Sequence, residues 1–170
     1  MTTLVLGGAR SGKSAHAEGL LPADEATYVA TARVDSTDTE WQARIAAHVD
    51  RRPTGWRTVE PPDLPDFLAT AHGPVLVDDV ATWLTGVMDD HGAWDGDLDG
   101  VRRECDRLVA AVRECPAELV LVSSEVGLGV VPSTRSGRLF RDQLGTLNAA
   151  LADVSAQVLL LVAGLPLRLR

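Results

Sequence analysis

The segment Leu4-Val5-Leu6-Gly7-Gly8-Ala9-Arg10-Ser11-Gly12-Lys13-Ser14 is the strongest indicator of the fold of this chain. It joins a short apolar run to a segment of helical pattern, and from Gly7 to Ser14 it matches G-x-x-x-x-G-K-[ST] at every fixed position. In a strand-loop-helix setting this pattern is typical of a phosphate-binding loop, whose backbone N–H groups converge on phosphate oxygens at the helix N-terminus. The alternative is a glycine-rich turn that matches by accident. We expect the chain to bind a nucleotide here.

Each residue type in this loop has a chemical reason. Gly7, Gly8 and Gly12 permit backbone angles closed to other residues and let the N–H groups approach the phosphates. Lys13 supplies a mobile positive charge for the β and γ phosphates, and the Ser14 hydroxyl is placed to bind Mg²⁺. The residues predicted to bind the nucleotide are Gly7, Gly8, Ala9, Arg10, Ser11, Gly12, Lys13 and Ser14.

Length, composition and charge limit the class of protein. The chain has 170 residues, 45% hydrophobic and 24% charged, which is typical of one globular domain over residues 1–170. Its formal net charge is -8 and Lys13 is its one lysine, so we expect no nucleic-acid partner, because binding a phosphate backbone requires clustered positive charge. The longest apolar stretch, 158–167, is too short to span a bilayer, and we expect no membrane segment.

The cysteines indicate the compartment. Cys105 and Cys115 lie ten residues apart in one predicted helix, about 15 Å along its axis, so they cannot pair within a chain. The N-terminus enters the first predicted strand without the pattern of a secretion signal. We therefore expect a reducing, cytoplasmic location.

Strand and helix patterns alternate along the chain. Short apolar, β-branched runs predict strands at 4–6, 27–30, 75–77, 119–122 and 158–162, with a weaker candidate at 57–59 and an edge strand formed by the tail over 164–170. Apolar stripes of helical spacing occupy 98–112 and 139–154, and a capping box at Thr37 and Glu40 predicts a helix through His48. The order predicts a three-layer α/β fold of the P-loop NTPase (RecA-like) class, with a mostly parallel central sheet.

A carboxylate for Mg²⁺ is expected at the end of a neighbouring strand. The run Val75-Leu76-Val77-Asp78 resembles a Walker B element, and Asp78 is the predicted metal ligand together with Ser14. Asp79 follows at once and could also approach the metal. The alternative for this pair is a helix start, where carboxylates cap the first turn.

Several ordered motifs carry a family resemblance that covers nearly the whole chain. With the phosphate-binding loop, they resemble the bifunctional adenosylcobinamide kinase and adenosylcobinamide-phosphate guanylyltransferase family of cobalamin (vitamin B12) biosynthesis. The motifs are Tyr28-Val29-Ala30-Thr31-Ala32-Arg33, Arg44-Ile45-Ala46-Ala47-His48-Val49-Asp50-Arg51-Arg52-Pro53, Glu125-Val126-Gly127-Leu128-Gly129-Val130-Val131-Pro132, Arg138-x-Phe140-Arg141-Asp142-x-x-Gly145-x-x-Asn148 and Val162-Ala163-Gly164-Leu165-Pro166-Leu167.

The resemblance implies two reactions and a homotrimer. ATP or GTP would phosphorylate adenosylcobinamide, and GTP would then transfer its guanylyl group to that phosphate, with pyrophosphate as the other product. In the family this transfer passes through a guanylylated histidine, and His48 matches that position. A neutral imidazole is an adequate nucleophile near neutral pH and a good leaving group. Lys13 would be needed in both reactions.

Other candidate ligands of the nucleotide remain open. Arg10 lies inside the loop and Arg52 follows His48, so both are predicted to contact phosphate, with a solvated surface role as the alternative. Glu125 is predicted to face the crevice beyond the carboxyl ends of the strands, with a loop anchor as the alternative. Arg44 and Arg51 are weaker candidates.

The sequence also departs from the family pattern. Asp79, Ser124 and Ser133 stand where we expect Cys, Asn and Glu. These positions border the expected crevice, so a weakened kinase half is one alternative. A P-loop kinase for another small molecule, in which His48 is incidental, and a regulatory P-loop NTPase are the others.

Overall fold

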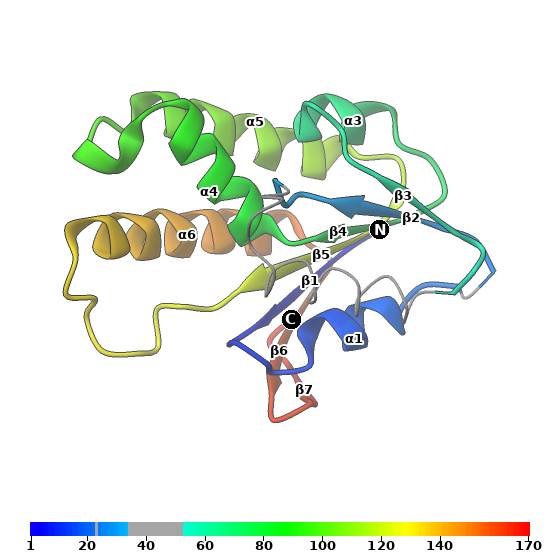
Figure 1. Ribbon diagram of the computed structural model, residues 1–170. Helices are drawn as coiled ribbons and strands as arrows, with labels where there is room; N and C mark the ends of the chain where they lie inside the picture. Colours follow the sequence, from blue (N-terminus) through cyan, green and yellow to red (C-terminus); the bar gives the residue numbers. More distant parts are fainter. Residues whose placement is uncertain (23, 34–52) are drawn as a thin grey trace.

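The computed structural model describes residues 1–22, 24–33 and 53–170. A seven-stranded sheet has the order β3-β2-β4-β5-β1-β6-β7, and all neighbouring strands pair in parallel except β7, which runs antiparallel to β6 (Figure 1). The predicted mostly parallel sheet is confirmed. The strands are β1 (Thr2–Gly7), β2 (Ala26–Ala30), β3 (Trp56–Val59), β4 (Pro74–Asp78), β5 (Glu118–Ser124), β6 (Gln157–Val162) and β7 (Leu165–Arg168).

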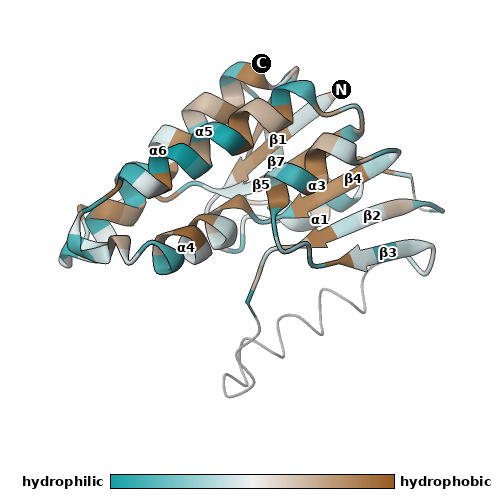
Figure 2. Ribbon diagram, turned by 90° about the horizontal axis from the view of Figure 1, so that it is seen from above, coloured by the Kyte–Doolittle hydropathy of each residue, from teal (hydrophilic) through white to brown (hydrophobic). Residues whose placement is uncertain are grey.

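Helices cover both faces of the sheet. Figure 1 shows α1 on one face and α3, α4, α5 and α6 on the other, and Figure 2 shows these four from above, with hydrophobic and hydrophilic residues on each of α4, α5 and α6. This arrangement confirms the three predicted layers. The helices are α1 (Lys13–Glu18), α3 (Leu64–Thr70), α4 (Val80–Asp90), α5 (Asp99–Glu114) and α6 (Arg135–Val154), with a short 3-10 turn, η1 (Ala93–Asp95).

Alternation along the buried strands divides the core in two. In β1, Leu4 and Leu6 pack into the core under α3 to α6, whereas Val5 belongs to the core under α1. All six residues of β1 are buried, as expected of a parallel strand covered on both faces. The phosphate-binding loop therefore begins at the end of a strand that is buried along its whole length.

Helix α3 was not predicted, and α4 was considered only as the alternative interpretation of the Asp78–Asp79 pair. Helix α3 begins after Asp63, whose carboxylate accepts a hydrogen bond from Asp66 N–H at 2.9 Å, and Pro65 lies in its first turn. An Asp cap followed by Pro in the first turn is a helix-start signal. The predicted helix over 37–48 lies outside the described residues.

The tail forms the predicted edge strand. This strand is β7, which pairs with β6. Cys105 lies in α5, but Cys115 is the residue that ends this helix, so placing both in one helix was wrong by one residue. Both cysteines are unpaired, as expected. No helix within the described ranges is long and apolar enough to cross a membrane.

Candidate functional site

The phosphate-binding loop joins β1 to α1. Gly12 precedes α1 with a left-handed φ of 88°, and Arg10 adopts a φ of 56° in the same region. Gly7 is needed for a different reason, because an added Cβ would collide with the Ser11 hydroxyl. Gly8 has neither a left-handed φ nor a neighbour within 4 Å of an added Cβ. Among the three loop glycines, Gly12 therefore uses the backbone freedom of glycine, and Gly7 is required by the close approach of Ser11.

Two polar side chains of the loop face its interior. The Lys13 ammonium donates a hydrogen bond to the Gly8 carbonyl at 3.2 Å, so the side chain folds back over the loop. The Ser11 hydroxyl is buried and has no hydrogen-bond partner in the part of the chain that the structure describes. Because buried polar groups are nearly always paired, an unpaired hydroxyl in this loop fits a site that is completed by a ligand.

The predicted metal ligands meet at the carboxyl edge of the sheet. The Ser14 hydroxyl donates to Asp78 Oδ1 at 3.3 Å, although β5 separates β4 from β1. The Tyr28 hydroxyl, from β2, donates to Asp78 Oδ2 at 2.9 Å. Hydroxyl and carboxylate oxygens are ligands that suit Mg²⁺. Tyr28 was not singled out as a site residue, because its reach to Asp78 depends on the pairing of β2 with β4.

Asp79 has a different role from Asp78. Its carboxylate accepts a hydrogen bond from Thr82 N–H at 2.6 Å and caps the N-terminus of α4. The helix-start alternative is therefore confirmed for Asp79, whereas Asp78 ends the strand and points toward Ser14.

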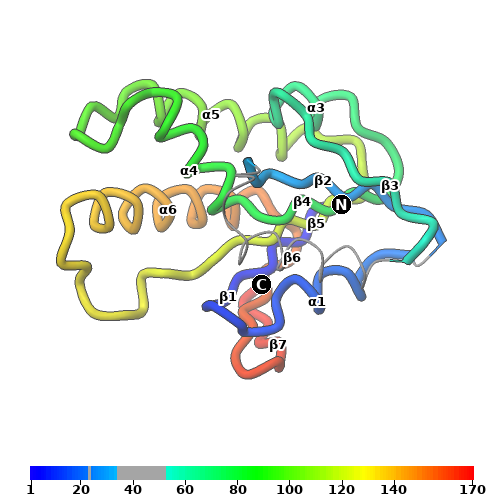
Figure 3. Tube along the Cα trace, viewed as in Figure 1, coloured from blue at the N-terminus to red at the C-terminus, as the bar shows by residue number. Residues whose placement is uncertain are grey.

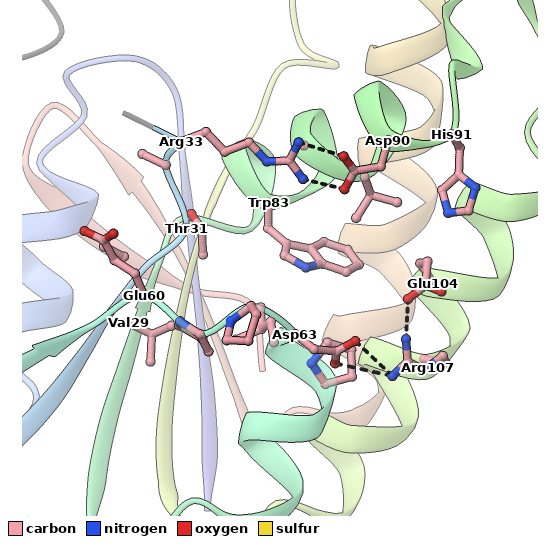
Figure 4. Close-up of a pocket in the computed structure, with 18 residues that line it drawn as sticks. Val29, Thr31, Arg33, Glu60, Asp63, Trp83, Asp90, His91, Glu104 and Arg107 are labelled. Carbon is pink, nitrogen blue, oxygen red and sulfur yellow. Dashed lines mark hydrogen bonds and ion pairs between the residues drawn. The ribbon is translucent and has the colours of Figure 1, made fainter. Parts of the chain in front are cut away.

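A pocket of about 510 Å³ adjoins this cluster, between the end of β2 and helices α4 and α5 (Figure 4). Thr31 lines the pocket, and its hydroxyl donates to the Asp79 carbonyl at 2.7 Å, so the pocket wall is fixed to the start of α4. The Trp83 indole lies along another wall. Glu60 and Asp63 contribute carboxylates.

An ion pair closes one side of the pocket. Arg33 donates to both carboxylate oxygens of Asp90, with 2.7 Å between Nη1 and Oδ1. This hydrogen-bonded pairing lowers the pKa of the Asp90 carboxyl. An added Cβ at Gly86, in the middle of α4, would lie 3.1 Å from Arg33 Nε. A glycine inside a helix is unfavourable by itself, and here it leaves room for the guanidinium.

Four of the predicted site residues cannot be placed relative to this cluster, because they fall in the range 34–52. His48, Arg52, Arg44 and Arg51 lie outside the described residues, and their roles stay predictions. The other histidines are His16 on α1, His72 in an exposed turn and His91 at the end of α4.

Two other kinds of site, a metal site formed by several side chains and a cysteine nucleophile, find no support in the described ranges. No group of three or more His, Cys, Asp or Glu side chains there could hold a metal ion. Burial raises the pKa of the Cys105 thiol to about 12, so this thiol is protonated near neutral pH and is a poor nucleophile.

Comparisons with known proteins decide the family. The family model described as cobinamide kinase / cobinamide phosphate guanyltransferase matches residues 3–169. The chain belongs to this family. The Bifunctional adenosylcobalamin biosynthesis protein CobU of Escherichia coli (strain K12) is 39% identical over 183 residues, covering 100% of both chains. The protein CobP of Pseudomonas aeruginosa, of the same description, is 41% identical over 178 residues, covering 100% of this chain and 98% of the relative.

A solved structure supports the fold class alone. An ATPase from the type III secretion system of pathogenic bacteria matches with a TM-score of 0.50 and 13% identity, over 94% of this chain and 50% of that chain. The chain thus spans half the length of that structure. The predicted P-loop NTPase fold is confirmed.

Two of the departures from the cobinamide kinase family pattern contact each other. The Ser124 hydroxyl donates to Asp79 Oδ2 at 3.3 Å, so the residues that replace the expected Asn and Cys form one hydrogen bond. From α6, the Asn148 side chain donates to the Ser124 carbonyl at 3.1 Å and accepts from the Ser123 hydroxyl at 2.6 Å. The end of β5 is thus held to α4 and to α6.

Glu125 begins the loop after β5. Its backbone N–H donates to the Gly7 carbonyl at 3.0 Å, so it lies beside the phosphate-binding loop. Its carboxylate accepts from Gly127 N–H at 2.8 Å, which is the loop-anchor alternative. Contact of Glu125 with the nucleotide stays a prediction.

Proposed function

We propose that the chain phosphorylates adenosylcobinamide and then guanylylates the product. In the first reaction the hydroxyl oxygen of the aminopropanol arm attacks the γ phosphorus of ATP or GTP, the bond to the bridging oxygen breaks, and the nucleoside diphosphate leaves. The hydroxyl proton is lost to solvent or a base. The match of the cobinamide kinase family model over residues 3–169 is the observation that carries this proposal.

The second reaction uses His48 as the nucleophile. An imidazole nitrogen attacks the α phosphorus of GTP, and pyrophosphate leaves. A phosphate oxygen of adenosylcobinamide phosphate then attacks the same phosphorus, the P–N bond breaks, and adenosylcobinamide-GDP forms. Two displacements at one phosphorus retain its configuration and replace one difficult step by two easier ones.

The phosphate-binding loop has a separate task in each reaction. In the kinase step, Lys13 and the loop N–H groups hold the phosphoryl group that is transferred. In the guanylyl step, they hold the β and γ phosphates and stabilise the charge of the leaving pyrophosphate. Ser14 and Asp78 would hold Mg²⁺, whose contribution is to neutralise phosphate charge. Their 3.3 Å separation supports this assignment.

The pocket beside β2 has room for part of a substrate. We propose that it takes the guanosine group, because its volume of about 510 Å³ lies in the range of small-molecule sites and an indole and carboxylates line it. A planar base can stack on Trp83, and a carboxylate such as Glu60 can accept from the N–H groups of guanine.

Labelling the protein tests the guanylyl step. After incubation with GTP labelled at the α phosphate and denaturation, we expect acid-labile, alkali-stable label on the chain, which His48→Ala loses. His72→Ala, which changes an exposed histidine in a turn, is the matched control and should keep the label. Unlabelled wild-type protein at high concentration, or full labelling of His48→Ala, would refute the role of His48.

We also propose an oligomeric state and a cellular location for the protein. The family resemblance supports a homotrimer with sites between subunits and a cytoplasmic location, with a corrinoid as the substrate. We also propose that Arg10 and Arg52 contact phosphate groups, because Arg10 lies inside the phosphate-binding loop and Arg52 follows His48 in the sequence.

A further inference from the structure

The loop between β5 and α6 holds apolar side chains in solvent. The exposed fractions are 39% for Val126, 82% for Leu128, 95% for Val130 and 62% for Val131. In Figure 3 this yellow segment projects from the body of the molecule. We call these four side chains the apolar loop surface. Gathered apolar exposure of this kind marks surfaces that bind a ligand or a partner.

Both ends of the loop are anchored to the fold. At its start, the Glu125 N–H donates to the Gly7 carbonyl at 3.0 Å. At its end, the Arg138 guanidinium donates to the carbonyls of Pro132 and Ser133, each at 2.9 Å. Hydrogen bonds therefore hold both ends of the loop, and its first residue lies beside the phosphate-binding loop.

The position of the loop favours contact with the acceptor of the phosphoryl group rather than with the nucleotide. The loop leaves the carboxyl edge of the sheet between β1, which carries the phosphate-binding loop, and β4, which carries Asp78. An acceptor hydroxyl that reaches the γ phosphate must approach from this edge, and the rest of the acceptor must extend over the loops there. Among the described residues at this edge, large exposed apolar side chains otherwise occur at Val162 and Leu165 only.

The chemistry of a corrinoid matches this surface. A corrin macrocycle is much larger than a nucleoside, so it exceeds the pocket beside β2, and the methyl groups on its periphery, among its amide side chains, offer apolar surface. We propose that the apolar loop surface binds the corrin ring of the acceptor while the aminopropanol arm reaches the phosphates. This inference rests on the function proposed above and adds the residues that hold the corrinoid.

Removing apolar surface from the loop tests the proposal. The double variant Leu128→Ser and Val130→Ser changes two highly exposed side chains, so folding should be unaffected. We expect its KM for adenosylcobinamide in the kinase assay to rise roughly tenfold or more with kcat unchanged, because binding common to ground and transition states is lost. Equilibrium dialysis with adenosylcobinamide, followed by its visible absorbance, should show the same loss of affinity.

The control is Leu169→Ser, which removes an apolar side chain of 55% exposure beyond β7, at the opposite edge of the sheet. It should bind adenosylcobinamide as wild type does. Guanylyl labelling of the protein needs no corrinoid and should be equal in all three proteins.

Three results would contradict the inference or its premise. Wild-type affinity in the double variant would overturn the corrin contact. A double variant that sediments as a smaller species than wild type, with unchanged affinity per site, would assign the surface to a second copy of this chain. Wild-type protein that neither binds adenosylcobinamide nor becomes labelled would instead refute the proposed function.

Discussion

Tyr28 is the chain's one tyrosine, and it holds one carboxylate oxygen of Asp78 while Ser14 holds the other. Tyr28 is only 4% exposed, because its ring packs in the core under α1 while its hydroxyl reaches Asp78. A carboxylate fixed at both oxygens keeps one orientation. We infer that Tyr28 is a positioning residue for the proposed Mg²⁺ ligand.

Tyr28→Phe tests this role at the scale of one hydroxyl group. Because a hydrogen bond to a charged group contributes about 1.5–3 kcal/mol, we expect the Mg²⁺ concentration needed for half-maximal GTP binding to rise about tenfold. Calorimetric titration of GTP at several Mg²⁺ concentrations measures this shift. GTP binding without Mg²⁺ is the internal control and should stay unchanged. An unaltered Mg²⁺ requirement would show that Tyr28 is purely structural.

Helix α6 could be predicted from its local sequence pattern, and it contacts the end of β5 next to the phosphate-binding loop. It runs from Arg135 to Val154, buries Leu144, Leu147 and Leu151 in the core, and carries Asn148 to the end of β5. Its apolar stripe was predicted from spacing. Its hydrogen bonds to Ser123 and Ser124 were not, because they depend on where the sheet lies beneath the helix.

The N-cap of α6 gives a prediction at the scale of an element. Thr134 accepts a hydrogen bond from Gly137 N–H at 3.1 Å, so Thr134→Ala should lower the free energy of unfolding by about 1 kcal/mol. Urea denaturation measures the change. Thr134→Ser keeps an oxygen at the cap and is the matched control, expected close to wild type. Equal stability of the Ala and Ser variants would mean that the cap contributes nothing.

The molecule as a whole should be stabilised by its nucleotide. A ligand that binds only the folded state at 100 times its Kd adds about 2.7 kcal/mol, which for a chain of this length raises Tm by about 5–10 °C. We expect this shift with Mg²⁺ and GTP in thermal unfolding followed by circular dichroism.

Lys13→Ala should lose most of this rise in Tm, because the charge on the β and γ phosphates is then unpaired. Arg113→Ala, which removes an exposed positive charge from α5, is the control and should keep it. A full rise in Lys13→Ala would refute our use of the phosphate-binding loop.

The phosphate-binding loop, the parallel strands and the family could all be predicted from the amino-acid sequence alone. These features depend on local chemistry: glycine and lysine at fixed spacing, apolar runs short enough for buried strands, and helical stripes of period 3.6. The fold class and the candidate residues Lys13, Ser14 and Asp78 could therefore be predicted without any knowledge of packing.

How these parts combine could not be predicted, because it depends on contacts between segments that are distant in the sequence. In the folded chain, Ser14 contacts Asp78 although a strand lies between their own strands, and Tyr28 donates to the same carboxylate. Asp79 caps helix α4, whereas Asp78 faces Ser14. Asp79 and Ser124 also contact each other, although 45 positions separate them. Such contacts follow from strand order and register, which depend on the packing of the whole chain rather than on any one segment.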